Sequence, residues 1–328
     1  VWELQNFIKK SGIWSDIVKQ GKSMEKAQVS FLWSDTSRRH QINTLGIPSP
    51  VFKNAEGLNA LFRNIHVERE ILTEPEVQKG EIPSCTKLII IPGSVYFEKA
   101  TYKKLEEFVK KGGWLFVIGD KGAYYDNRGK KDFTFYNIAS IVPINIPGPR
   151  FLEYNGKTIT DFGNLSKWYG WKDIGKQMEI LASTAEDYPV IVKVKKGKGG
   201  IILSSYPLGN IYLVLTNCGL ITKPFPESAI IFQGIMKDIL GSLNIQETAE
   251  ASSLIEVHPW YYKKGEYLLI TNLQLYKEGA FSIKLPYAVK SIYDVINNAK
   301  VPVKAEDGKT LFDVYLGKGD GMVLEVKK

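Results

Sequence analysis

The residues best suited to covalent or metal chemistry are few and widely separated in this sequence. Its 328 residues include two cysteines, Cys85 and Cys218, and three histidines, His40, His66 and His258. A zinc site needs ligands at short regular spacings, and a catalytic thiol needs a base beside it. The sequence contains no C-x-x-C, H-x-x-x-H or H-E-x-x-H pattern. We therefore expect ordinary thiols and structural histidines, and no metal.

A lysine- and glycine-rich segment, residues 195–200, could suggest phosphate binding. A P-loop, however, needs G-x-x-x-x-G-K and then Ser or Thr between a strand and a helix. Here two strand-like runs flank the segment, which is typical of a hairpin turn. Residues 34–38, after the first predicted strand, also lack the glycines of a dinucleotide-binding turn. The sequence thus predicts no nucleotide cofactor.

Three acidic residues, Asp120, Asp126 and Asp132, lie in a segment rich in glycine, asparagine and aromatic residues. Glycoside hydrolysis needs two carboxyl groups about 5 to 9.5 Å apart on a rigid scaffold. Loop acids of this kind more often form turns or salt bridges. A complete glycoside hydrolase, with its acids within residues 120–188, is therefore kept as an alternative hypothesis.

Aromatic residues in the same segment are the best candidates for binding. Trp168, Tyr169 and Trp171, together with Tyr125, could cover the apolar C–H faces of sugar rings. The competing interpretation is an aromatic subunit interface or the core of the segment itself. We predict a carbohydrate contact at these four residues, and keep packing as the alternative.

Charge and hydropathy exclude two classes of partner. The formal net charge is +8, which could indicate nucleic acid, but the lysines occur as dispersed pairs. No basic run is interleaved with stacking aromatics, so we expect no nucleic-acid binding. No apolar run reaches the roughly 18 to 20 residues that a membrane span needs, so we expect no membrane partner. Two cysteines, neither in a C-x-x-C pair, give no disulfide framework and favour the reducing cytoplasm.

The first part of the chain alternates strand and helix patterns. A helical pattern at residues 2–17 opens the chain without an initiator Met, which suggests a piece of a longer protein. The predicted strands are residues 27–33, 67–72, 87–93 and 114–118, with a hairpin at 190–194 and 201–205. The predicted helices are residues 55–66, 102–111 and 227–243. Residues 120–188 show no sustained period and are expected to be an insertion at the carboxyl edge of the sheet.

After residue 248 the sequence pattern changes to short predicted strands separated by turns. Seven strands are predicted, at residues 254–257, 266–271, 280–285, 291–295, 301–303, 311–315 and 322–326. Strands without helices predict a β-sandwich. The fold class is therefore α/β, with an open, largely parallel sheet flanked by helices over residues 1–248, followed by a small all-β sandwich over residues 249–328.

The chain resembles the C-terminal half of family 42 glycoside hydrolases, which are β-galactosidases. The resemblance rests on the order of the predicted elements and on two segments, Leu-Ile-Ile-Ile-Pro-Gly at residues 88–93 and Phe-Val-Lys-Lys-Gly-Gly at residues 108–113. In that family, a (β/α)8 barrel with two catalytic glutamates precedes a trimerisation domain with a class I glutamine-amidotransferase-like fold and a small β-domain. A barrel typically needs about 250 residues and eight repeats. The predicted elements of this chain leave no room for one.

The resemblance also implies where amidotransferase chemistry would lie. The cysteine nucleophile would follow the strand at 114–118, where this sequence has Gly119-Asp120. The His-Pro-Glu step would follow the strand at 201–205, where it has Tyr206-Pro207-Leu208. The triad is therefore absent and no catalytic residue is predicted.

These observations lead to one functional hypothesis and two alternatives. We expect a non-catalytic oligomerisation and accessory region of a β-galactosidase-like glycosidase, with the barrel domain or chain as its partner. The resemblance implies a homo-oligomer, specifically a trimer, and no cofactor. The alternatives are the complete glycoside hydrolase described above and a free-standing carbohydrate-binding module.

Overall fold

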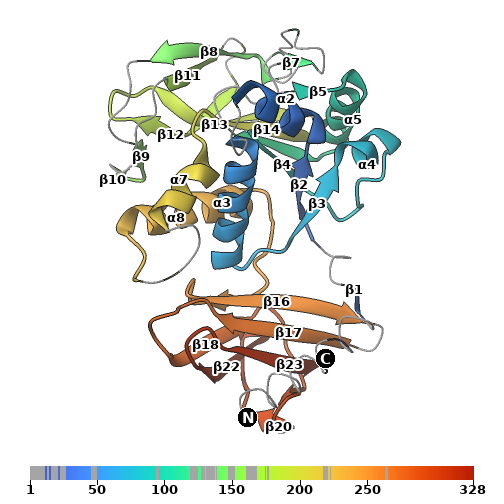
Figure 1. Ribbon diagram of the computed structural model, residues 1–328, viewed down its shortest axis with the longest axis vertical. Coiled ribbons are helices and arrows are strands. Elements are labelled where there is room, and N and C mark those ends of the chain that lie inside the picture. Colours follow the sequence, from blue (N-terminus) through green and yellow to red (C-terminus); the bar gives the residue numbers. More distant parts are fainter. Residues whose placement is uncertain are drawn as a thin grey trace.

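The computed structural model divides into an α/β part and an all-β part, stacked along the long axis of the molecule (Figure 1). The structure describes residues 12, 15, 21–22, 27–45, 50–93, 96–118, 125–126, 130, 137, 139–146, 152–159, 168–173, 175, 177–216, 221, 223–262 and 265–328. The mixed α/β sheet, its flanking helices and the following sandwich confirm the predicted fold class.

The α/β part is built on one open sheet. Among the described residues, nine strands follow the order β10-β9-β12-β13-β14-β6-β4-β2-β3. The parallel half consists of β3 (Arg69–Thr73), β2 (Val29–Trp33), β4 (Leu88–Pro92), β6 (Trp114–Ile118) and β14 (Gly199–Ser204). The antiparallel half consists of β13 (Pro189–Lys196), β12 (Met178–Thr184), β9 (Leu152–Tyr154) and β10 (Lys157–Ile159). β4 is buried along its whole length, because helices cover both faces of the central strands.

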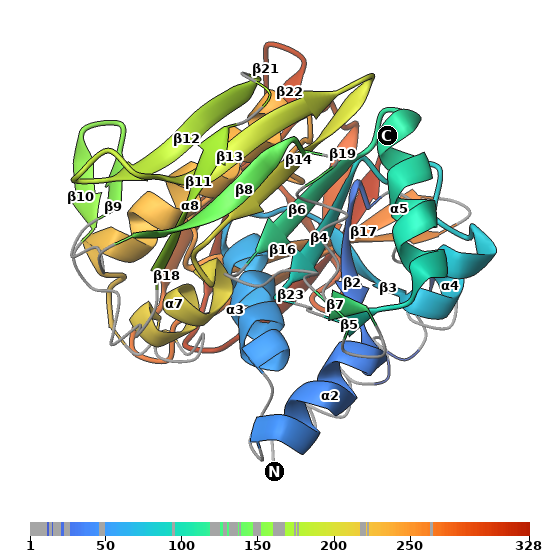
Figure 2. The same ribbon diagram turned by 90° about the horizontal axis from the view of Figure 1, so that it is seen from above.

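Helices cover the two faces of this sheet unequally (Figure 2). One face packs against α3 (Pro50–Asn64), α7 (Leu208–Leu215) and α8 (Glu227–Ser242). The other packs against α4 (Glu74–Lys79) and α5 (Lys99–Lys110). α2 (Asp35–Leu45) follows β2 directly. Two separate apolar cores result, one on each face of the sheet.

The all-β part is a sandwich of two antiparallel sheets. In the described chain one sheet has the order β1-β16-β17-β23-β19-β20 and the other β15-β18-β22-β21. The first comprises β1 (Gly21–Lys22), β16 (Ile255–Tyr262), β17 (Gly265–Asn272), β23 (Gly321–Lys327), β19 (Ser291–Asp294) and β20 (Ala299–Val301). The second comprises β15 (Glu250–Ala251), β18 (Gly279–Leu285), β22 (Lys309–Leu316) and β21 (Lys304–Glu306). Alternating apolar residues of both sheets form the third core.

Several elements differ from the sequence-based expectation. Residues 120–188, predicted as an insertion, supply β9, β10 and β12 to the main sheet itself. They also form β8 (Ile141–Ile146), which pairs with β11 (Trp168–Asp173), and β7 (Tyr125–Asp126), which pairs with β5 (Tyr96–Phe97). β1 pairs with β16, so part of the predicted 1–248 unit adds a strand to the sandwich. The predicted helix at residues 2–17 lies outside the described residues except at positions 12 and 15.

The turn at the end of α3 fastens the two parts together. His66 adopts a left-handed φ of 55°, and its carbonyl accepts a hydrogen bond from the Thr248 amide at 2.7 Å. Its Nε2 lies 3.2 Å from the Ala251 carbonyl and 3.1 Å from that of Ser252. Burial lowers the pKa of His66 to about 4, so the ring is neutral at physiological pH.

None of the helices in the described ranges combines the length and the apolar character needed to cross a membrane.

Candidate functional site

The positions where amidotransferase chemistry was considered hold no base in the described part of the chain. β14 ends at Ser204, and Tyr206 and Pro207 lead directly into α7, with Pro207 as its N-cap. The Tyr206 ring is fully buried, and burial raises the pKa of its hydroxyl above the usual range. Gly119 and Asp120, which follow β6, lie outside the described residues.

Cys85 and His40 make contacts that are typical of structural residues. The Cys85 thiol donates to the Ala27 carbonyl at 3.3 Å, and burial, together with the negative charge of Glu70, raises its pKa. A nucleophilic thiol requires the opposite shift. His40 stacks on Tyr96 with ring centroids 4.4 Å apart. No group of three or more metal-ligating side chains occurs within the described ranges, and Cys218 lies outside them.

The aromatic residues predicted to bind sugar lie on β7 and β11. The Trp171 side chain is 1% exposed, and its indole N–H donates to the Val190 carbonyl at 3.1 Å. Its ring therefore packs in the core and presents no face to a ligand in this structure. The side chains of Trp168, Tyr169 and Tyr125 lie outside the described residues, so for these three the carbohydrate contact stays a prediction.

The predicted acids of a complete hydrolase are not brought together among the described residues. Asp120 and Asp132 lie outside them, and of Asp126 only the backbone, in β7, is described. The structure therefore describes no pair of carboxyl groups formed by these three aspartates.

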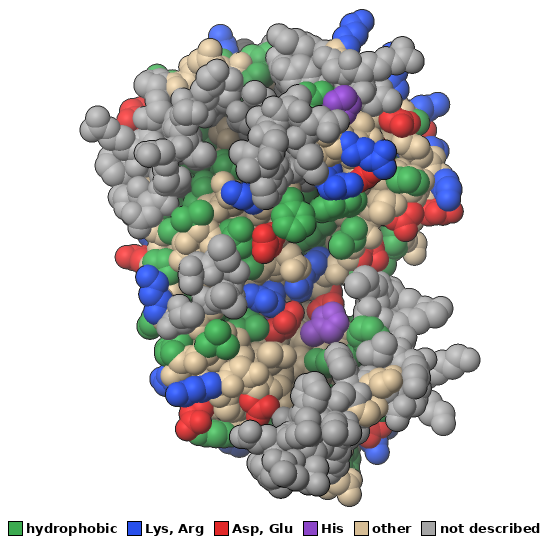
Figure 3. Space-filling view, in the orientation of Figure 1, with side chains coloured by type: hydrophobic (Ala, Val, Ile, Leu, Met, Phe, Trp, Pro, Cys, Tyr) green, Lys and Arg blue, Asp and Glu red, His purple; other side chains and the backbone are tan. Residues whose placement is uncertain are grey.

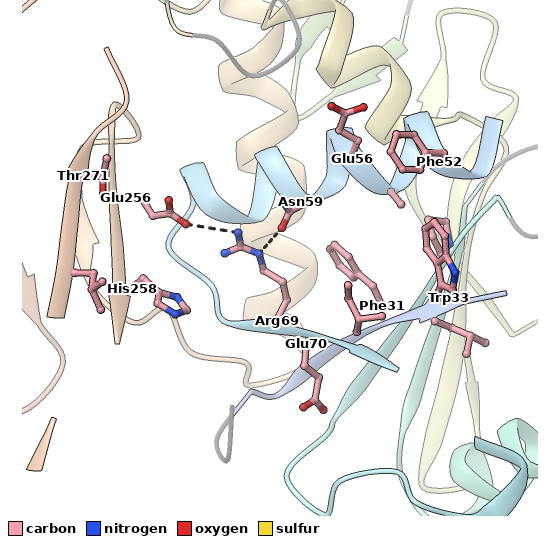
Figure 4. Close-up of a pocket in the computed structure, with 15 residues that line it drawn as sticks. Phe31, Trp33, Phe52, Glu56, Asn59, Arg69, Glu70, Glu256, His258 and Thr271 are labelled. Carbon is pink, nitrogen blue, oxygen red and sulfur yellow. Dashed lines mark hydrogen bonds and ion pairs between the residues drawn. The ribbon is translucent and has the colours of Figure 1, made fainter. Parts of the chain in front are cut away.

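A cavity of about 620 Å³ lies instead at the junction of the α/β part and the sandwich (Figure 4). We call it the junction cavity. Its walls come from β2, α3, β3 and the end of β4 on one side, and from β16 and β17 on the other. The side chains that define its character are Trp33, Phe52, Asn59, Arg69, Glu256 and His258.

The strand order explains why this cavity exists. β3 is the last strand of the main sheet, and its parallel register with β2 places Ile71 beside Phe31, on the same face as α3. α3 covers Phe31, whose ring meets Phe62 edge to face at 5.3 Å, but it does not cover β3. Ile71 is consequently 68% exposed and Phe52, on α3, is 48% exposed. A groove with apolar walls is left between α3 and the edge strand.

Charged side chains close the end of the junction cavity beside the sandwich. Arg69 donates from Nε to Asn59 Oδ1 at 2.8 Å, and its Nη2 lies 3.6 Å from Glu256 Oε1. The Arg69 and Glu256 side chains are 15% and 25% exposed. Burial lowers the pKa of Arg69, whereas the charge of Glu256 opposes that shift. The cavity therefore contains an incompletely desolvated ion pair that bridges the two parts.

His258 forms a second bridge at the same end. Its Nδ1 lies 3.2 Å from Glu68 Oε1, at the start of the edge strand. Burial alone lowers the pKa of His258, but the hydrogen bond to Glu68 and the negative charges of Glu68 and Glu256 outweigh it and raise the pKa. The imidazole thus has a greater share of its charged form near neutral pH than an unperturbed histidine.

The other end of the junction cavity is aromatic. Trp33, the last residue of β2, meets Phe52 edge to face at 6.3 Å with an interplanar angle of 81°. On the face shown in Figure 3, apolar side chains gather at mid-height, with acidic, basic and histidine side chains below them. Sequence reasoning missed this site because it depends on which strand lies at the sheet edge, which the patterns do not reveal.

Comparison with solved structures finds proteins with a similar fold. The GH42 β-galactosidase of G. stearothermophilus matches with a TM-score of 0.64 and 13% identity, over 92% of this chain and 40% of that enzyme. The β-galactosidase of Bacillus circulans sp. alkalophilus matches with a TM-score of 0.64 and 12% identity, over 92% of this chain and 41% of that enzyme. This chain has their fold. The α-L-fucosidase isoenzyme 2 of Paenibacillus thiaminolyticus matches with a TM-score of 0.60 and 12% identity, over 92% of this chain and 48% of that enzyme.

These matches confirm the resemblance inferred from the sequence at the level of the fold. The chain spans about 40% of the length of the β-galactosidases it matches, consistent with a part of those enzymes that lies outside the barrel. No protein-family model matches the sequence, and no curated protein does either.

Proposed function

We propose that this chain is a non-catalytic accessory and oligomerisation region of a β-galactosidase-like glycoside hydrolase. The observation that carries the proposal is the coverage of the structural matches: 92% of this chain corresponds to only about 40% of each β-galactosidase. A region of this kind needs a catalytic barrel as its partner, in the same polypeptide or in another. The cysteine content is compatible with a cytoplasmic protein.

The chemistry of the described residues supports an accessory role. The one thiol that the structure describes, Cys85, has a raised pKa, and Tyr206 fills the position where the resemblance implies an imidazole. A thiol of raised pKa is mostly protonated at neutral pH and is a poor nucleophile. The described residues therefore supply no thiol-based amidotransferase site.

Association with other chains is supported by exposed apolar side chains on the helical face of the α/β part. Val214 on α7 is 71% exposed, and Ile230 on α8 is 52% exposed. Apolar side chains become buried when subunits associate, and interface cores are enriched in them. We propose a homo-oligomer, a trimer by resemblance, and these side chains as candidates for its contacts.

The non-catalytic part of the proposal is tested by hydrolysis of aryl β-galactosides and aryl α-L-fucosides. The purified chain alone is expected to give no turnover above that of a heat-inactivated sample. Turnover that disappears in the Asp120→Asn, Asp126→Asn or Asp132→Asn variant would overturn the proposal in favour of a complete hydrolase.

A further inference from the structure

We infer that the junction cavity is a binding site for a neutral saccharide of one or two hexose units. This inference goes beyond the proposed function and does not depend on it, since it rests on the geometry of the cavity. Its volume of about 620 Å³ falls within the range of about 300 to 1,000 Å³ that small-molecule sites occupy.

The apolar walls suit the C–H faces of a sugar ring. Trp33 and Phe52 stand edge to face at one end, and Ile71 extends the apolar surface along the edge strand. Phe52 and Ile71 are 48% and 68% exposed, so both leave apolar area in water that a ligand could cover. Covering such area is favourable by about 25 cal/mol for each Å² removed from water.

The polar end offers both donors and acceptors for hydroxyl groups. Arg69 commits its Nε to Asn59, but its Nη2 is 3.6 Å from Glu256, which is longer than a hydrogen bond. The guanidinium and the carboxylate therefore retain hydrogen-bonding capacity on the side of the cavity. Figure 4 shows Arg69 between α3 and the sandwich, with Glu256 and His258 facing it from β16. A hydroxyl group can donate to Glu256 and accept from Arg69 at the same time.

The charge balance of the lining favours a neutral ligand. Glu256 faces Arg69 and His258, and Glu56 also lines the cavity, so neither sign dominates. Glu70 also borders the cavity, but its carboxylate is engaged on the other face of the sheet, where Ser30 donates to it at 2.9 Å. An anion would meet Glu56 and Glu256. A pure hydrocarbon would strip water from the Arg69–Glu256 pair without replacing its hydrogen bonds.

The strongest rival ligand is an organic cation. A quaternary ammonium group could lie over the face of Trp33 and be balanced by Glu56. A saccharide is favoured because Arg69 is already present in the cavity and would repel a second positive charge. The rival is nevertheless a distinct outcome of the test.

The test is calorimetric titration of the chain with galactose, lactose and tetramethylammonium. We expect saturable binding of at least one of the two sugars and none of tetramethylammonium. Phe52→Ala and Asn59→Ala should each weaken sugar binding about tenfold, which corresponds to ~1.4 kcal/mol. Ile180→Ala, on a side chain that is 53% exposed and outside the cavity, should leave it unchanged.

Each variant is first compared with the parent chain by thermal unfolding, so that loss of fold is not mistaken for loss of the site. Absence of saturable binding by both sugars would overturn the inference. So would binding that neither cavity substitution weakens, or preferential binding of tetramethylammonium. The self-association proposed above is unaffected by any of these results, because its candidate side chains lie on α7 and α8.

Discussion

Replacing Gly57 by alanine should separate α3, which lines the junction cavity, from α7, which packs against it. A Cβ atom at Gly57 would lie 1.7 Å from the Gly209 carbonyl oxygen, on α7. Ordinary contact begins at 3.4 Å, so the two backbones would have to move apart by roughly 1.7 Å. Neither atom belongs to a flexible side chain, so α3 and α7 must shift as units.

The shift would also weaken the capping of α7. Asn54 on α3 accepts hydrogen bonds from the Gly209 and Asn210 amides at 2.7 and 3.1 Å, and Pro207, the N-cap residue, makes no side-chain capping bond. Overpacking costs about 1–3 kcal/mol, and each weakened hydrogen bond costs about 1 kcal/mol. The higher helix propensity of alanine compared with glycine stabilises the folded state by about 1 kcal/mol. We expect a net loss of about 3 kcal/mol.

The assay is urea unfolding followed by far-UV circular dichroism, with thermal unfolding as a second measure. For 328 residues, a loss of about 3 kcal/mol should lower Tm by about 4 °C. Gly234→Ala in α8 is the matched control, because no atom lies within 4 Å of the added Cβ. It should stabilise by up to about 1 kcal/mol. If Gly57→Ala behaves like Gly234→Ala, the close approach of α3 and α7 is refuted.

Three further outcomes follow from buried groups. Because burial lowers the pKa of His66 from 6.5 to about 4, the unfolded chain binds its proton first, so stability should fall by up to about 3 kcal/mol as pH drops through that window. His66→Asn, which tolerates the left-handed φ, should flatten this dependence in urea titrations at several pH values. Trp171→Phe should cost about 1–2 kcal/mol, since the buried hydrogen bond from the indole N–H to the Val190 carbonyl and part of a buried ring are lost; an unchanged unfolding midpoint would contradict its buried position. Cys85 should react with a thiol reagent more slowly than glutathione does at neutral pH, and equal rates would contradict its raised pKa.

The elements that sequence patterns predicted are those whose environment is uniform along their length. β4 and β6 are continuous apolar runs because both of their faces are covered, and the sandwich strands alternate because one face is solvated. α7 was not predicted, because a helix that is apolar on nearly all sides shows no helical period. Its sequence, LGNIYLVL, is apolar almost all round and shows no helical period, since it is buried against α3 and α8.

The candidate site could not be predicted because it depends on strand order and not on local pattern. Residues 67–72 were predicted as a strand, but nothing in them indicates that β3 is the sheet edge left uncovered by α3. Arg69 and Glu256 meet only because the sandwich docks against the end of α3 through His66. The expected absence of the amidotransferase groups, in contrast, rests on the sequence alone, because the resemblance assigns each group to one position of it.

The mass of the chain in solution, measured by light scattering during size-exclusion chromatography, tests the proposed accessory role most directly. The monomer mass is 37.0 kDa. We predict a defined multiple of this mass, three by resemblance, or a stable complex with a glycosidase barrel chain supplied separately. A mass of 37.0 kDa at every concentration, with no binding to such a barrel, would contradict it.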